Sequence, residues 1–123
     1  MGNDNVFSYR KLKVYDKARK WVLMVYALLK KFPKEEQYAL CDQLRRSAIS
    51  VCSNVAEGSS RSSKKEFSHY IEISYGSLME AQSQLELSQM LGYISGYDLK
   101  EIEVKTEEIA RMLSGLRCSL TGK

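Results

Sequence analysis

The sequence predicts an all-α protein, an antiparallel up-down-up-down four-helix bundle in which residues 1–123 form a single domain. Three observations lead to this class. The chain has 123 residues and is 44% hydrophobic, values that suit one globular domain. It contains a single proline, and its few glycines mostly separate stretches with helical spacing of apolar residues. These stretches have similar lengths and short connections, which make consecutive helices antiparallel neighbours.

The first helix is expected over residues 11–32, because its apolar residues recur in steps of three and four and so share one face. This stripe consists of Tyr15, Ala18, Val22, Val25, Leu29 and Phe32. Pro33 should end the helix, since proline disfavours helical geometry in the residue before it. The second helix is expected over residues 34–57, with acidic residues in its first turn and Gly58 as its stop.

Capping boxes should open the last two helices, because a serine and an acidic residue three positions later can satisfy each other's backbone N–H groups. The pairs are Ser63 with Glu66 and Ser95 with Asp98. The third helix is expected over residues 64–91, with Gly92 as its stop. The fourth is expected over residues 96–119, and Thr106 interrupts its apolar stripe.

More apolar residues lie beside these stripes than the core of one small bundle needs. They include Trp21, Met24, Tyr26, Leu28, Ile73, Tyr75, Leu87 and Val104. Some of them should widen the core, and the rest suggest a second buried face, so a homo-oligomer is expected.

The cysteines and the chain start suggest the compartment. Cys41, Cys52 and Cys118 are odd in number and lack CxxC spacing, so they are interpreted as small residues of a reduced cytoplasmic protein rather than as disulfide or metal sites. No apolar run approaches the ~20 residues that a membrane span needs, and the first residues lack the pattern of a secretory signal. A cytoplasmic location without membrane contact is therefore expected.

No catalytic constellation is recognised. Glu66 and His69 have the E-x-x-H spacing of di-iron bundles, but such sites need two of these motifs and His69 is the only histidine. The same scarcity argues against Ser-His-Asp and Cys-His sites, and the sequence has no P-loop, GxGxxG or HExxH motif. No enzymatic activity, metal or cofactor is therefore expected.

Polar residues of the second helix share one side, beside the apolar stripe. They are Ser47, Ser50, Asn54 and Glu57. Small polar side chains let a neighbouring helix approach and can fix its register by hydrogen bonds, and Gly76 and Ser77 of the third helix could supply a matching thin surface. Polar packing between helices is favoured here over a ligand site.

The basic residues carry the sharper functional hypothesis. The net charge is +4, but residues 1–34 hold nine Lys and Arg against two Asp, giving +7, while the remainder holds ten against thirteen, giving −3. The up-down order should gather the start of the first helix, the end of the second, the start of the third and the end of the fourth at one end, here termed the basic pole. Its residues are Arg10, Lys11, Lys13, Arg61, Lys64, Lys65, Arg117 and Lys123.

Two of these lysines stand where they cost stability. Lys64 and Lys65 fall in the first turn of a helix, where the helix dipole disfavours cations. A placement against local stability suggests a function, and a basic pole with helix N-terminal N–H groups suits phosphate backbones. The alternative is a solvated surface that only aids solubility. The sequence shows no recognition helix for a nucleic-acid groove and no aromatic platform for base stacking, so no base specificity is predicted.

Several segments carry a family resemblance. The main signature runs from Ser50 to Gly58 and follows the segment Leu44-Arg45-Arg46-Ser47-Ala48. Its signature positions are Ser50, Asn54, Glu57 and Gly58. Further matches are Leu12–Tyr15, Phe32–Pro33, Glu66–Phe67, Gly76–Glu80 and Leu91–Tyr93. Together they span residues 7–120, and the chain resembles the 23S rRNA-intervening sequence proteins, also called the four helix bundle protein family. Valine stands where the signature usually has isoleucine, a conservative change.

This resemblance implies a four-helix bundle in which the signature positions Ser50, Asn54, Glu57 and Gly58 have a structural role. The family is also similar to the accessory variability determinant protein of diversity-generating retroelements, a basic homopentamer that binds nucleic acid and works with a reverse transcriptase. By that likeness a homopentamer is expected, a reverse transcriptase becomes a candidate partner, and Arg45 and Arg46 join the candidate nucleic-acid contacts.

Two functional hypotheses follow from these features. The leading one is a non-enzymatic homo-oligomeric protein that associates with nucleic acid, RNA before DNA, through a basic surface. The alternative is a protein-interaction scaffold or adaptor with no direct nucleic-acid contact, which the apolar residues beside the stripes motivate.

Overall fold

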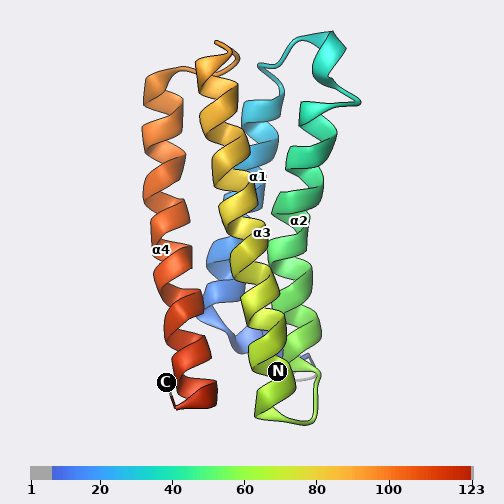
Figure 1. Cartoon of the computed structure of the whole chain (residues 1–123), viewed down its shortest axis with the longest axis vertical. Helices are drawn as coiled ribbons and strands as arrows, with labels where there is room; N and C mark the ends of the chain where they lie inside the picture. Colours follow the sequence, from blue (N-terminus) through green and yellow to red (C-terminus); the bar gives the residue numbers. More distant parts are fainter. Residues whose placement is uncertain (1–6, 123) are drawn as a thin grey trace, which may run out of the picture.

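The computed structural model describes residues 7–122, and Lys123 of the expected basic pole lies outside this range. It contains four long helices, α1 (Lys13–Leu29), α2 (Leu40–Ser59), α3 (Lys64–Met90) and α4 (Gly96–Thr121), and two short 3-10 helices, η2 (Ser8–Lys11) and η3 (Lys34–Glu36). The long helices alternate in direction (Figure 1). Each packs against the next, and α1 also packs against α4, which closes the bundle. The predicted fold class, an all-α four-helix bundle, is confirmed.

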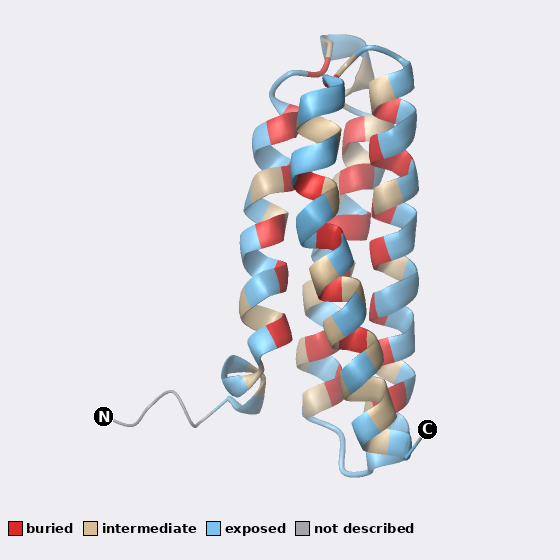
Figure 2. Cartoon of the chain, turned by 90° about the vertical axis from the view of Figure 1, so that its left-hand side faces the viewer, coloured by how far each residue is buried: buried red, intermediate tan, exposed pale blue. Residues whose placement is uncertain are grey.

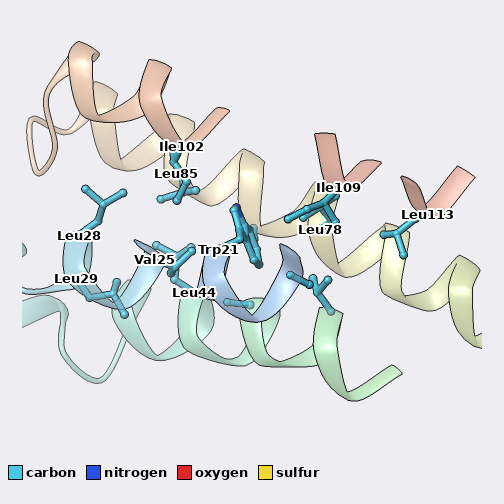
Figure 3. Packing of buried hydrophobic residues seen from close by; sticks show 14 of the residues in the cluster. Trp21, Val25, Leu28, Leu29, Leu44, Leu78, Leu85, Ile102, Ile109 and Leu113 are labelled. Atoms are coloured by element: carbon cyan, nitrogen blue, oxygen red, sulfur yellow. The ribbon is translucent and has the colours of Figure 1, made fainter. Parts of the chain in front are cut away.

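The core runs along the axis between the four helices, where the buried residues face inward (Figure 2). Trp21 lies in the middle of this core, with labelled residues of all four helices around it (Figure 3). Its ring N–H donates a hydrogen bond of 3.0 Å to the Thr106 hydroxyl, which in turn donates to the Ile102 carbonyl at 3.0 Å. Thr106 is therefore a satisfied polar member of the core rather than an interruption of it.

The buried face of α1 is rotated relative to the expected stripe. Its fully buried positions include Val14 and Trp21, whereas Tyr15 and Val22 of the expected stripe are half-buried. Leu28 also belongs to the core. Of the apolar residues placed beside the stripes, the exposed ones are Tyr26, Ile73, Tyr75, Leu87 and Val104.

α2 begins at Leu40 rather than at residue 34. Ahead of it the chain forms η3, and Ala39, with φ −126° and ψ −100°, is outside the helical region. The Arg45 guanidinium donates 2.9 Å to the Gln37 carbonyl and so fastens this turn onto α2. The connection between α1 and α2 is therefore longer than the sequence suggested.

The helix caps follow the sequence signals closely. Ser95 and Asp98 form the complete capping box at the start of α4, with N–H···O distances of 2.9 and 3.0 Å. At the start of α3 only half of the predicted capping box forms: the Ser63 hydroxyl accepts the Glu66 backbone N–H at 3.1 Å, but the Glu66 carboxylate contacts the Ser63 hydroxyl at 3.5 Å rather than its backbone N–H. Gly92, with φ +84°, follows the end of α3 as predicted.

Gly58 does not stop α2, which continues to Ser59. The glycine is buried against α3, and a Cβ atom there would lie 2.7 Å from the Tyr70 Cβ and 2.9 Å from the Phe67 Cδ1. Such distances are below normal contact, so only glycine lets the two helices approach this closely. The expected role as a helix stop is wrong, and the residue serves helix packing.

Candidate nucleic-acid interface at the basic pole

Chain order alone assembles the basic pole. η2 and the start of α1, the end of α2, the start of α3 and the end of α4 lie at the same end of the bundle (Figure 1). The members within the described residues are Arg10, Lys11, Lys13, Arg61, Lys64, Lys65 and Arg117. All are exposed except Arg117, which is half-buried and lines a hollow of about 300 Å³ between α3 and α4 together with Glu72.

Ion pairing takes up little of this positive charge. Within residues 7–122, Arg61 is the member of the pole that forms an ion pair, with Glu57 one turn earlier, and its guanidinium lies 4.9 Å above the Tyr70 ring. Lys64 and Lys65 precede Glu66 in the first turn of α3. The pole therefore combines exposed cations with the N-terminus of a helix, an arrangement that favours anions.

Arg45 and Arg46 do not join the basic pole. They lie in the second turn of α2, and Arg46 precedes Ser59, the last residue of this helix, by thirteen positions, or ~20 Å of helix. Arg45 is engaged with the Gln37 carbonyl, and Arg46 pairs with Asp42 at 3.3 Å. Any contact they make with nucleic acid would therefore be separate from that of the pole.

The signature residues of α2 build its interface with α3. The Ser50 and Ser77 hydroxyls lie 2.7 Å apart, and the Asn54 amide donates 2.9 Å to the Ser50 carbonyl. One turn away, the Ser47 hydroxyl lies 3.1 Å from the Gln84 amide oxygen. Gly76 is exposed with open space around it, so it does not supply the thin surface expected of it.

Cysteine and histidine positions add no reactive cluster. Cys41 is buried, and Cys52 and Cys118 are half-buried. Burial raises the pKa of the Cys52 thiol to about 11, so this group is uncharged at neutral pH. Over the described part of the chain, no three His, Cys, Asp or Glu side chains gather as a metal ion would need. The E-x-x-H residue His69 packs its ring beside Tyr70, 6.0 Å between centroids.

Sequence reasoning missed a group of aromatic rings at the edge of the basic pole. Phe7 and Tyr9 of the η2 segment and Tyr15 of α1 contact one another in series, and we term them the aromatic cluster. They adjoin an α1–α2 groove of about 480 Å³, lined by residues including Tyr9, Tyr15, Val22, Leu23, Ile49 and Ala56. The available signal was the alternation of aromatic and basic residues from Phe7 to Arg19.

Comparison with known proteins establishes the family. The sequence profile of the 23S rRNA-intervening sequence protein family matches residues 10–115. The chain belongs to that family. A search of curated proteins finds no match. No helix within residues 7–122 combines the length and apolarity needed to cross a membrane.

A crystal structure provides a fold-level parallel for this family member. It is a protein of unknown function from the S23 ribosomal protein family of Bacteroides thetaiotaomicron, 23% identical in sequence. The superposition has a TM-score of 0.77 and covers 84% of this chain and 96% of that one. The likeness supports the four-helix architecture.

Proposed function

We propose that this family member is a non-enzymatic, homo-oligomeric cytoplasmic protein that binds nucleic acid, RNA before DNA, through the basic pole. The observation that carries the proposal is the convergence of seven exposed or half-exposed Lys and Arg at one end of the bundle, from η2, the start of α1, the turn between α2 and α3, the start of α3 and the end of α4. Phosphate backbones are recognised chiefly by such clustered cations, with affinity that falls as salt displaces them.

The direct test is binding of labelled RNA and DNA across a salt series. We expect measurable affinity at low salt and a linear fall of log affinity with log salt concentration, because each phosphate contact releases a counterion. Affinity no better than about millimolar at low salt, or a flat salt response, would contradict the proposal.

A charge-reversal pair locates the contact. Replacing Lys64 and Lys65 with Glu should weaken binding and flatten the salt slope, since two phosphate contacts are lost. The bundle should remain folded, because acidic residues are favourable in the first turn of α3. The matched control is Lys30→Glu with Lys34→Glu, which makes the same change of charge at the opposite end of the molecule. Equal losses from the two pairs would show that net charge alone governs binding.

Self-association is part of the proposal. Leu87 and Val104 are half-exposed or more, which leaves apolar surface on α3 and α4 for another copy to cover. The resemblance to the accessory protein of diversity-generating retroelements makes a pentamer the expected state and a reverse transcriptase a candidate partner. Light scattering on the purified protein tests this directly, and a monomer at micromolar concentration would contradict it.

A protein-interaction scaffold is the second candidate, favoured by the same exposed apolar side chains. Pull-down from native lysate with and without nuclease separates the two functions. A protein partner retained after nuclease treatment, from a chain that binds no purified nucleic acid, would favour the scaffold.

A further inference from the structure

The aromatic cluster is the strongest feature that the basic pole does not explain. The Phe7 and Tyr9 rings are stacked with centroids 6.0 Å apart, and the Tyr9 and Tyr15 rings meet edge to face at 4.7 Å. Phe7 is 48% exposed although it is a large apolar side chain. The cluster is also held in place, because the Ser8 hydroxyl lies 3.2 Å from the Ser59 carbonyl and hydroxyl at the end of α2.

Arginines flank the cluster at both ends. The Arg10 guanidinium lies 4.7 Å above the Phe7 ring, and the Arg19 guanidinium lies 5.9 Å from the Tyr15 ring. Arg19 is positioned by Asp16, at 3.0 Å, and together with Arg10 and Tyr15 these residues line a second hollow of about 360 Å³. Asp16 is the acidic residue of this hollow, and its charge is shared between Arg19 and Lys20.

The α1–α2 groove continues from the cluster as an apolar surface. Val22, Leu23 and Ile49 line it, and Leu23 is 69% exposed. The volume of about 480 Å³ lies within the ~300–1,000 Å³ typical of ligand sites. The feature therefore presents flat rings and aliphatic side chains bordered by guanidinium groups.

We propose that the aromatic cluster is a stacking platform for unpaired bases, so that the chain prefers single-stranded over double-stranded nucleic acid. This inference rests on the proposed function and names the substrate class of that interface. Single strands are bound by combining a cationic track for the phosphates with aromatic rings on which the bases stack. A duplex keeps its bases stacked inside and can offer this site only its backbone.

The charge around the cluster selects nucleic acid over a protein segment as its occupant. Arg10, Lys11 and Lys13 lie on the segments that carry the rings, η2 and the start of α1, and the Arg10 guanidinium lies over the Phe7 ring. The Tyr15 hydroxyl and the Cys52 thiol both have a raised pKa through burial, so neither adds negative charge at neutral pH. The surroundings thus favour a ligand that is flat, apolar in part, and anionic.

The test compares an unstructured oligouridine of about 12 nucleotides with an RNA hairpin duplex of similar length, using fluorescence anisotropy. Phe7→Ala and Tyr9→Ala should each weaken oligouridine binding roughly 5- to 100-fold, as loss of one stacked base does. Hairpin binding should change by less than about twofold, and the salt slope should be unchanged, since the phosphate contacts remain. Tyr9→Phe, which keeps the ring, should restore oligouridine affinity.

A control variant and a crosslinking measurement test whether the effect is specific to the aromatic cluster. Tyr38→Ala removes a more exposed ring at the opposite end and should leave both affinities unchanged. Photo-crosslinking of a 5-bromouridine oligonucleotide to the unaltered protein should map to Phe7, Tyr9 or Tyr15. Crosslinks found only on α3 and α4 would overturn the platform.

The two proposals fail in different ways. If the protein binds RNA and the Lys64 and Lys65 substitutions weaken it, but Phe7→Ala and Tyr9→Ala affect both RNAs equally or neither, the platform is wrong and the basic pole stands. A groove that binds a protein segment would give this same result. If the unaltered protein binds no nucleic acid at any salt concentration, both proposals are wrong.

Discussion

α2 meets its two neighbours through faces of different chemistry. Toward α3 it presents Ser50 and Gly58, which allow close approach and hydrogen bonding. Toward α1 it presents Ile49 and Ala56, and the α1–α2 groove remains between the helices. The comparison teaches that one face of α2 secures the fold while the other leaves surface accessible to a ligand.

α1 also packs against α4, on its other side. Trp21 donates to Thr106 within the core, and Lys31 pairs with Asp98 at 2.9 Å near the end of α1. Surface ion pairs such as Lys31–Asp98 contribute little to the free energy of unfolding. The buried Trp21 should therefore contribute most of the stability of the α1–α4 contact. The following substitutions test whether the buried core and the α2–α3 interface carry the stability of the bundle, while the side chains of the α1–α2 groove contribute little to it.

The largest effect is expected at Trp21. Trp21→Ala should lower the free energy of unfolding by about 3–5 kcal/mol, because it leaves a cavity in the core and removes the partner of Thr106. Urea unfolding followed by circular dichroism at fixed protein concentration measures this. Tyr26→Ala, on the exposed side of the same helix, should cost about 0.5 kcal/mol or less. Similar losses from both would refute a dominant role for the buried ring.

Gly58→Ala should destabilise the close packing of α2 against α3. The added Cβ would lie 2.7 Å from the Tyr70 Cβ, and overpacking of this kind costs about 1–3 kcal/mol. Gly76→Ala is the matched control on α3, where open space should let alanine stabilise the helix by about 0.5–1 kcal/mol. Thermal unfolding of the two variants should therefore shift in opposite directions, and shifts of the same sign would rule out the close contact.

The hydroxyl pair between α2 and α3 should show coupling. Ser50→Ala and Ser77→Ala should each cost about 1 kcal/mol, because each removes the hydrogen bond between the two hydroxyls, and Ser50→Ala also removes an acceptor of the Asn54 amide. The double variant should cost less than the two single losses combined, since no unpaired hydroxyl is left between them. A double-mutant cycle by urea unfolding measures this, and strict additivity would count against the pair.

The smallest effect is expected on the open face. Ile49→Gln should change the free energy of unfolding by no more than about 0.5 kcal/mol, because the side chain is 46% exposed in the groove. Leu23→Gln should behave alike. A loss above about 1 kcal/mol that depends on protein concentration would instead indicate that another copy covers the groove.

Local signals made most of the fold predictable. The capping box of Ser95 and Asp98 and the stop at Gly92 are encoded within a few residues, so their positions were predicted correctly. The location of the basic pole followed from chain order once the helices were assigned. The same reasoning could have separated Arg45 and Arg46 from the pole, since they fall at the opposite end of α2.

The errors concern features that a neighbouring helix determines. On α1, the apolar stripe that contains Tyr15 and the one that contains Trp21 both have the spacing of a helix face. The Trp21 stripe is the buried one, and its tryptophan donates a hydrogen bond to Thr106 on α4. Gly58 resembles a helix stop until the side chains of Tyr70 and Phe67 on α3 are known to lie against it. The aromatic cluster was missed because Phe7 and Tyr9 precede the first long helix and have no periodicity to reveal their contact.

The hydrogen bond between Trp21 and Thr106 also bears on the order of folding. It joins residues 85 positions apart, whereas α2 with α3 and α3 with α4 meet across short turns. Bringing distant segments together costs more chain entropy, so contacts of high sequence separation form later. We therefore expect the contact between α1 and α4, which closes the bundle, to form last. Since Trp21 is the single tryptophan of the chain, its fluorescence reports that final step.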